Sequence, residues 1–174
     1  MLEMTHFATQ LQTTQWLVAS LVAEYGATTL HHVYGGIVYR TPERLAIAAF
    51  FTLALVVTMF ALVRSLRQQS PQFVSGLVIG LVWVVMLGFF EGGYNHAYKD
   101  TLFIIGMPKE TVLGLMPVLM AGDFTYPPDN SAFEVSGVLQ FVFSLPTAYF
   151  LYRFIRDQIG SRQENSTVHA TKTR

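Results

Sequence analysis

The chain has 174 residues, of which 52% are hydrophobic and only 13% charged, and its 11 basic residues balance 11 acidic ones. Soluble domains carry about 25% charged residues, so this chain has too few charges for an ordinary water-facing surface; disorder, a collagen-like repeat and nucleic-acid binding are excluded. The sequence contains no cysteine, which excludes disulfides and thiolate ligands and leaves His, carboxylate, Met and backbone oxygen to hold any metal ion.

Long hydrophobic runs predict an all-α fold, a polytopic integral membrane four-helix bundle. About 20 apolar residues are needed to cross a bilayer, and the clearest span is the uncharged run Leu45–Val63, which has arginines on both sides. The first span continues its apolar start through Glu24 and a pair of histidines. We expect a membrane helix there rather than a signal peptide, because no basic segment precedes it. The predicted spans are residues 14–39, 44–67, 72–97 and 133–156.

The third and fourth spans are separated by the longest connection, residues 98–132, which we expect to form a partly structured outer loop. Its apolar stretches are too short and too often interrupted by Gly and Pro to cross a bilayer. They predict a short interfacial or re-entrant helix that begins near residues 109–111. Residues 1–160 are thus predicted to form one transmembrane domain, and the polar residues 161–174 a flexible cytoplasmic tail.

The basic residues near the ends of the spans predict the orientation in the membrane. On the side of both termini lie Arg64, Arg67, Arg153, Arg156, Arg162, Lys172 and Arg174, and on the opposite side lie Arg40, Arg44, Lys99 and Lys109. By the positive-inside rule, this imbalance places both termini in the cytoplasm, with the chain in an inner or plasma membrane.

The first span carries polar and ionisable residues that a bilayer disfavours. Charged side chains within a membrane cost a few kcal/mol each, so they tend to face other helices and to mark function. Glu24, Thr28 and His31 fall in one stripe of an α-helix at about 100° per residue, and His32 lies at its edge. The alternative is that these groups only hydrogen-bond between helices and hold the bundle together.

The third span ends in a second polar segment, which begins at Glu91. In an α-helix Glu91, Asn95 and Tyr98 share a face, whereas His96 points about 140° away from Glu91. We expect the two glycines that follow Glu91 to loosen the helix and let both side chains converge. In an up-and-down bundle the ends of the first and third spans lie on the same side of the membrane. Topology therefore brings this segment to the histidines of the first span.

Imidazoles and carboxylates that converge from two helices predict a metal site in the outer half of the bundle, suited to zinc, iron or copper. Haem b held between His31 or His32 and His96 is a second interpretation, and a polar network without a ligand is a third. The predicted metal ligands are Glu24, His31, His32, Glu91 and His96. The residues expected to support them or to bind a ligand are Thr28, Tyr34, Asn95, Tyr98, Asp100 and Asp123.

Three functions are compatible with this pattern. The first is binding of a metal ion or small ligand in the outer half of the bundle. The second is a non-enzymatic accessory subunit that docks on a larger membrane complex through helix faces rich in small residues. The third is transport coupled to a proton or cation, in which Glu24 and the histidines form the relay and the protein acts as an oligomer, since four spans are few for a transporter. The expected partners are the lipid bilayer and either a second copy of the chain or a membrane complex.

Overall fold

The structure is a computed structural model that describes residues 2–68, 76, 78–116 and 128–172. Within these residues every regular element is a helix and none is a strand, which confirms the all-α prediction. The elements are α1 (Leu2–Val38), α2 (Pro42–Gln68), η1 (Ile79–Tyr98), α4 (Lys99–Ile104), α5 (Lys109–Leu115) and α6 (Ser131–Lys172).

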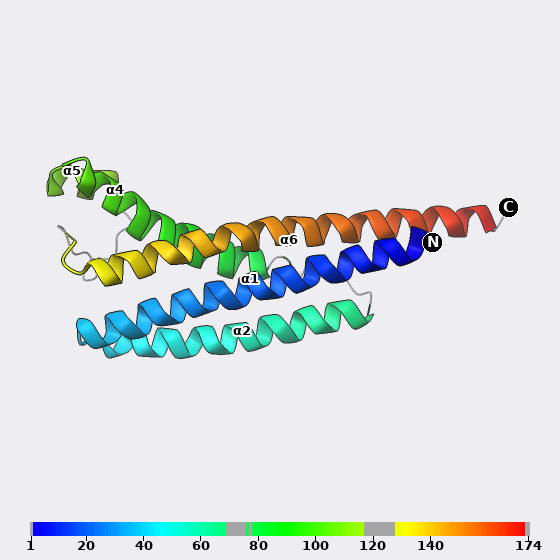
Figure 1. Ribbon diagram of the computed structural model, residues 1–174, viewed down its shortest axis with the longest axis horizontal. Helices are drawn as coiled ribbons and strands as arrows, with labels where there is room; N and C mark the ends of the chain where they lie inside the picture. Colours follow the sequence, from blue (N-terminus) through cyan, green and yellow to red (C-terminus); the bar gives the residue numbers. More distant parts are fainter. Residues whose placement is uncertain (1, 69–75, 77, 117–127, 173–174) are drawn as a thin grey trace.

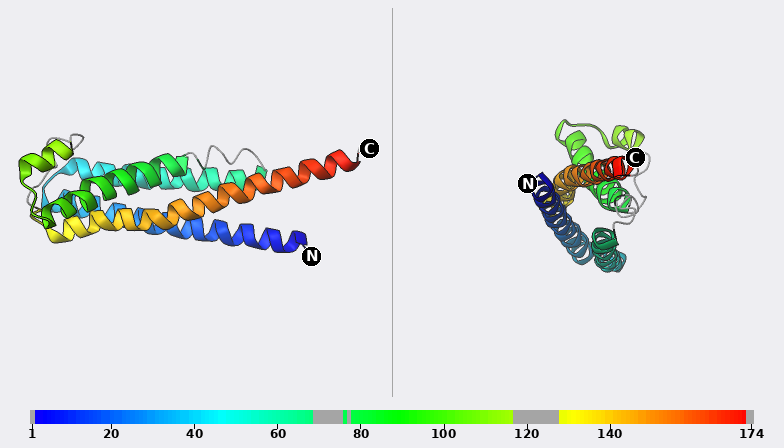
Figure 2. Two further views of the ribbon diagram at one scale, coloured as in Figure 1. Left: turned by 90° about the horizontal axis from the view of Figure 1, so that it is seen from above. Right: turned by 90° about the vertical axis from the view of Figure 1, so that its right-hand side faces the viewer.

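The long helices α1, α2, η1 and α6 lie side by side (Figures 1 and 2). α6 packs along η1 and along α1, and α1 also packs along α2. α1 and α6 run antiparallel, so both termini lie at one end of the molecule. The opposite end, where α1 ends and α6 begins, is called the distal end here.

A tight turn joins α1 to α2 at the distal end. The amide of Tyr39 donates to the carbonyl of Gly35 at 2.9 Å, which closes the last turn of α1. Arg40 then adopts a left-handed φ of 55°, and Pro42 begins α2, where its missing N–H costs no helical hydrogen bond. The turn fixes α1 and α2 side by side and leaves His31 two turns before the end of α1.

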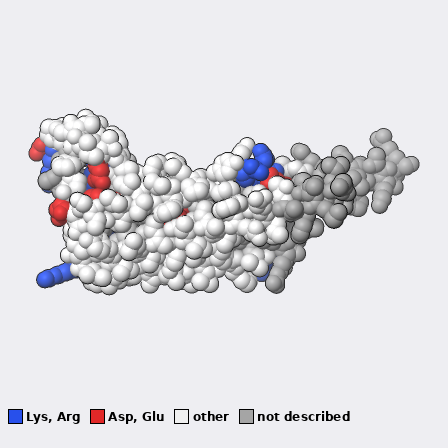
Figure 3. Space-filling model, in the orientation of Figure 1, with Lys and Arg blue, Asp and Glu red and all other residues white. Residues whose placement is uncertain are grey.

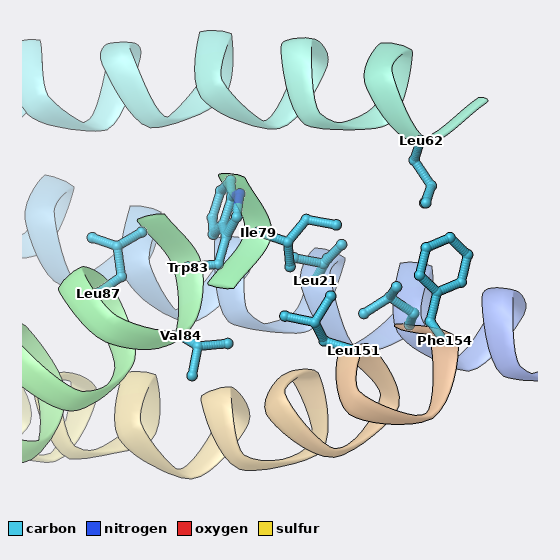
Figure 4. Packing of buried hydrophobic residues seen from close by; sticks show 9 residues of the cluster. Leu21, Leu62, Ile79, Trp83, Val84, Leu87, Leu151 and Phe154 are labelled. Atoms are coloured by element: carbon cyan, nitrogen blue, oxygen red, sulfur yellow. The ribbon is translucent and has the colours of Figure 1, made fainter. Parts of the chain in front are cut away.

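The main hydrophobic core lies away from the distal end (Figure 4). Trp83 of η1 is fully buried in it, and its Nε1 donates to Oγ1 of Thr58 on α2 at 3.1 Å, so the indole is both packed and hydrogen-bonded. The buried cluster comprises Leu17, Leu21, Leu62, Ile79, Trp83, Val84, Leu87, Leu151 and Phe154. Hydrophobic burial therefore holds all the long helices together here, whereas polar residues gather at the distal end.

η1 is wound as a π-helix, with hydrogen bonds between residues i and i+5. Two of its glycines lie directly against α6. A Cβ at Gly88 would collide with the side chain of Ser144, and one at Gly92 would collide with the backbone of Phe141. The absence of these side chains lets the two backbones approach closely and brings the polar end of η1 against α6.

Two helical segments are long and apolar enough to cross a membrane, Pro42–Arg64 and Ser131–Asp157, with mean hydropathies of 2.6 and 1.3. They correspond to the second and fourth predicted spans. In the parts of the first and third predicted spans that the structure describes, α1 and η1 do not meet the same criterion, because polar residues interrupt their apolar stretches. The four-span membrane bundle is thus supported at two segments and stays a prediction at residues 14–39 and 72–97.

Short helices occupy the described part of the predicted outer loop. α4 continues directly from η1, and α5 begins at Lys109 after an extended Pro108, where the sequence predicts a short helix. At the other end of the molecule α6 continues to Lys172, so the backbone of residues 161–172 is helical where the sequence predicts a flexible tail. The flexibility of that segment and its cytoplasmic location stay predictions.

Candidate metal centre

Three of the predicted ligands meet at the distal end. His31 comes from α1, and Glu91 and His96 come from the last turns of η1. Each residue offers one ligand atom, and the three atoms lie within 4.8 Å of one another. His31 is fully buried and His96 is 4% exposed, whereas the side chain of Glu91 is 23% exposed. The group could therefore hold a metal ion, and its open side lies at Glu91.

The two imidazoles direct their Nε2 atoms at the same carboxylate oxygen. Oε1 of Glu91 lies 3.8 Å from Nε2 of His31 and 4.0 Å from Nε2 of His96. Neighbouring ligand atoms of a tetrahedral zinc site are about 3.4 Å apart, so small side-chain rotations would bring these atoms to ligand spacing. The two ring centroids are 4.5 Å apart, which leaves no room for a porphyrin between His31 and His96. A haem held by this pair therefore does not fit.

The winding of η1 explains why Glu91 and His96 share the site. Residues five apart point about 140° apart in an α-helix, whereas the i to i+5 hydrogen bonds of a π-helix place them almost above one another. Nδ2 of Asn95 donates to Oε2 of Glu91 at 3.0 Å and leaves Oε1 facing the imidazoles. The two side chains thus converge as expected, but through a change of winding along the whole of η1 rather than a local loosening at two glycines.

α6 holds the other ring nitrogen of His31. Nδ1 lies 3.2 Å from the carbonyl oxygen of Phe133 and 3.1 Å from Oγ of Ser136. The Ser136 hydroxyl itself donates to that carbonyl at 2.7 Å, so both groups act as acceptors and Nδ1 carries the hydrogen. Nε2 is then the unprotonated nitrogen. It is buried and has no hydrogen-bond partner within the described part of the chain.

A carboxylate of α6 holds His96 in the same way. Nδ1 of His96 lies 2.6 Å from Oε2 of Glu134, whose other oxygen accepts from Nζ of Lys99 at 2.7 Å. Metal-binding histidines usually donate from the second ring nitrogen to a carboxylate or carbonyl, which fixes the ring and makes the ligating nitrogen more basic. In their neutral forms both imidazoles therefore present an unprotonated Nε2 to Glu91.

Glycines make room for the packing of these rings. A Cβ at Gly137 of α6 would collide with the ring of His96, and one at Gly35 of α1 would collide with the ring of Phe133. Phe133 in turn stacks on His31, with ring centroids 4.2 Å apart. The positions of the imidazoles thus depend on the close approach of α6 to α1 and η1.

The other two predicted ligands do not belong to this group. Glu24 is fully buried on α1, two turns nearer the N-terminus than His31, beside Thr147 of α6. His32 is also buried, and its ring packs against the rings of His31 and of Phe51 on α2, with centroids 5.3 Å from each. The structure therefore brings together three of the five predicted ligands.

The residues expected to support the ligands have different positions. Thr28 is fully buried on α1, one turn nearer the N-terminus than His31, and the amide of Asn95 donates a hydrogen bond to Glu91. Asp123 lies outside the residues that the structure describes.

Two tyrosines of the same prediction contact neighbouring residues of the chain. The hydroxyl of Tyr34 donates to Oδ1 of Asn130 at 3.3 Å. Tyr98 stacks on Tyr94, with centroids 6.1 Å apart, and is 40% exposed. These contacts tie Tyr34 to the segment before α6 and Tyr98 to the surface of η1.

Asp100 lies behind the site, next to the ion pair between Lys99 and Glu134. Its Oδ1 is 3.8 Å from Nζ of Lys99. Burial and the neighbouring charge of Glu134 raise the pKa of Asp100 from 3.8 to about 6. Asp100 is thus an electrostatic neighbour of the ion pair and does not belong to the three-residue group.

Three residues around the site were not among those predicted from the sequence: Glu134 and Ser136 of α6, which orient the imidazoles, and the buried cation Lys99. A signal for Glu134 was present, because it lies at the start of the fourth predicted span, where an unpaired charge is costly. Up-and-down topology also places the start of the fourth span beside the ends of the first and third. A buried carboxylate at that position is expected to find a partner such as His96.

Comparisons of the chain with protein-family models, curated proteins and solved structures gave no match. Function is therefore inferred from the ligand set, its hydrogen bonds and the apolar surface of the helices. Two imidazoles with one carboxylate form the His₂Glu sites of zinc enzymes and the facial triads of non-haem iron(II) proteins.

Proposed function

We propose that this chain is a small integral membrane protein that binds one transition metal ion through His31, Glu91 and His96. The orientation of the two imidazoles carries the proposal, since each bonds an acceptor on α6 through Nδ1 and turns Nε2 toward Glu91. Packing alone does not require this arrangement, because it leaves the buried Nε2 of His31 without a partner in the described structure. A bound metal ion would satisfy that nitrogen.

Zinc is the ion that this ligand set favours, with iron(II) as the alternative. Two neutral imidazoles and one carboxylate are zinc ligands in catalytic sites, where a fourth position stays open for water or substrate. A zinc ion would supply Lewis acidity to a molecule bound at that position. Copper(II), the third candidate from the sequence, prefers tetragonal geometry, which three ligands from two helices favour less.

The exposed surfaces support a membrane location. Only 17% of the apolar window in Pro42–Arg64 is buried, so most of that part of α2 faces outward, whereas 33% of the window in Ser131–Asp157 is buried because α6 also packs on α1 and η1. On α2 this surface includes Phe50, Leu53 and Phe60, each at least 60% exposed. Figure 3 shows charged residues toward both ends of one face and a broad, nearly charge-free region between them. A lipid-facing surface has these properties.

We extend the proposal to four membrane spans, with α1 and η1 crossing beside α2 and α6. Polar residues within a span are tolerated when they face neighbouring helices, as the buried Glu24 and His31 do. The basic residues favour termini in the cytoplasm, which would put the metal centre in the outer half of the bundle. Association with a second copy or a larger membrane complex stays a prediction.

Elemental analysis of the full chain tests the metal proposal. The protein would carry an affinity tag without histidine, be purified in detergent without chelators, be loaded with zinc and be freed of excess metal. We expect about one zinc ion per chain for the native protein and for the control His32→Gln, and loss of zinc from His31→Ala/His96→Ala. A native protein that retains neither zinc nor iron would overturn the proposal, as would a double variant with the native metal content.

A further inference from the structure

A carboxyl group without a hydrogen-bond partner among the described residues lies in the interior, on the side of the candidate metal centre that faces the N-terminus of α1. Glu24 is fully buried on α1, and neither of its oxygens makes a hydrogen bond with a described residue. Thr147 of α6 is the polar side chain beside it. An ionised carboxylate buried without a partner is expensive, so the protonation state of Glu24 is the central question at this position.

The surroundings of Glu24 follow from the antiparallel register of α1 and α6. The position of Glu24 and the hydrogen bond between His31 and Ser136 place Thr28 alongside Gln140. Thr28 and Gln140 are fully buried, and neither the hydroxyl nor the amide has a hydrogen-bond partner in the described structure. Polar but uncharged groups thus separate Glu24 from the metal centre.

The surrounding helices offer no charge to balance an ionised Glu24. Within the part of the chain that the structure describes, Glu24 makes no ion pair. The titratable and charged side chains of these helices include Tyr25, His31 and His32 on α1, Arg44 and Arg64 on α2, Glu91 and His96 on η1, and Glu134 and Arg153 on α6, and none of them is paired with Glu24. The neutral acid is the form that this environment accommodates.

We propose that Glu24 carries a proton in the metal-free protein and releases it to solvent when a divalent metal ion binds at the candidate metal centre. The inference rests on the proposed metal-binding function. In this step the carboxylic acid loses one H⁺, and its carboxylate stays in the interior as a counter-charge to the metal ion. Apart from the coordinate bonds that the metal ion would form with its ligands, the O–H bond of Glu24 is the one bond that breaks.

The distance along α1 sets the strength of this coupling. Seven residues separate Glu24 from His31, so the metal ion would lie about 10 Å from the carboxyl group. At an effective dielectric constant of about 20, two positive charges at that distance favour the ionised form by about 100-fold. Because coupling is reciprocal, ionisation of Glu24 strengthens metal binding by the same factor.

The substitution Glu24→Gln separates the charge from the shape of the side chain. Gln has the size of the neutral acid but cannot release a proton, so the variant is expected to fold and to retain a full complement of zinc. Its zinc affinity should be lower than native in mildly alkaline buffer, by up to about 100-fold, and equal to native in acidic buffer. The control Glu43→Gln makes the same change at an exposed position of α2 and should match the native protein.

Proton release measured during a zinc titration tests the coupling. The native protein, Glu24→Gln and Glu43→Gln would be titrated in detergent, in weak buffer with a pH-indicator dye. Glu24→Gln should release up to one proton fewer per zinc ion than the other two. Equal proton release with full zinc binding in all three would overturn the coupling and leave the metal site intact, whereas no zinc binding by the native protein would overturn the proposed function itself.

Infrared spectroscopy gives a second measurement on the native chain. The metal-free protein should show the C=O stretch of a protonated carboxylic acid, which weakens when zinc is added and is missing from Glu24→Gln. An identical carboxylic-acid band in the native protein and in Glu24→Gln would overturn the assignment of the proton to Glu24.

Discussion

Two groups of buried polar residues lie between α1 and α6, and they differ in how many of their polar atoms have hydrogen-bond partners. At the distal end, His31 and His96 each have an acceptor on α6 for one ring nitrogen and direct the other at Glu91. Nearer the middle of α1, Glu24 and Gln140 have no hydrogen-bond partner among the described residues. The first group could therefore hold a metal ion with its imidazoles already oriented, whereas the unpaired polar atoms of the second lower the stability of the fold.

The largest expected effect is a difference in zinc affinity between variants of the adjacent residues His31 and His32. His31→Ala removes a ligand and should weaken zinc binding by at least about 100-fold, more than the loss of an outer hydrogen-bond partner causes. His32→Ala should keep native affinity, because His32 packs near Phe51 and lies outside the three-residue group. Competition with a fluorescent zinc chelator measures both constants. An equal loss of zinc affinity in the two variants would show that His31 is not preferred to His32 as a metal ligand.

Glu134 holds the distal cluster together through His96 and Lys99. Glu134→Gln should lower the free energy of unfolding by up to about 3 kcal/mol, because it leaves the buried charge of Lys99 with only the more distant carboxylate of Asp100. It should also weaken zinc binding by about 10- to 100-fold through its effect on His96. Thermal unfolding in detergent and zinc titration measure the two effects.

The double variant Lys99→Met/Glu134→Gln serves as the control for that substitution. It also removes the buried cation that lost its closest partner, so the free energy of unfolding should recover while zinc affinity stays low. Recovery of both quantities together would mean that Glu134 acts on the metal site only through folding.

Gly137→Ala tests the site without touching a ligand. The new methyl group would collide with the ring of His96, so we expect a loss of about 10-fold in zinc affinity from the forced shift of the ring. Gly26→Ala is the matched control, since a Cβ at Gly26 meets nothing within 4 Å. Zinc titration measures the affinity of both variants. A native zinc affinity in Gly137→Ala would contradict the close packing of Gly137 against the ring of His96.

Gln140→Leu tests the second group, in which the side chains of Glu24 and Gln140 have no hydrogen-bond partners among the described residues. Replacing an unpaired buried amide by an apolar side chain should be neutral or should raise the free energy of unfolding by about 1 kcal/mol. Ser136→Ala, in the distal cluster, should lower it by about 1 kcal/mol because His31 loses a hydrogen-bond partner. Denaturation of both variants in one detergent gives the comparison. A large destabilisation by Gln140→Leu would show that the amide is satisfied after all.

The smallest effect concerns Asp100. Its pKa rises from 3.8 to about 6 on folding, so its ionisation opposes folding: the loss of stability develops as the pH rises from about 4 to about 6 and persists above. Asp100→Asn removes this loss and should unfold at a slightly higher temperature than the native protein at neutral pH. The two proteins should unfold at the same temperature below about pH 4. A variant that is less stable at neutral pH would reverse the sign assigned to Asp100.

The position of the site was predictable from sequence because it depends on topology. The apolar runs located α2 and α6, and the alternation of helix direction brought the end of the first span beside the end of the third. The winding of η1 was not predictable, since the α-helical period separates Glu91 from His96. It accompanies close packing on α6 at Gly88 and Gly92, which involves residues about 50 positions apart.

The choice among the ligands of α1 was also beyond the sequence. The helical period shows which side chains of α1 point in the same direction. It does not show at which position along α1 the residues of a second helix make contact. Glu91 and His96 meet α1 at His31, so Glu24 lies two turns away from them. His32 lies at the edge of the stripe, and in the structure its ring lies near Phe51 of α2.

X-ray absorption at the zinc edge tests the central claim most directly, because it reports the atoms bound to the metal ion. For the zinc-loaded native protein we expect only nitrogen and oxygen ligands at about 2.0–2.2 Å, with the scattering of two imidazoles. In His96→Ala the contribution of one imidazole should disappear. A native spectrum that contains sulfur or lacks imidazole, or a His96→Ala spectrum identical to the native one, would contradict a metal centre formed by His31, Glu91 and His96.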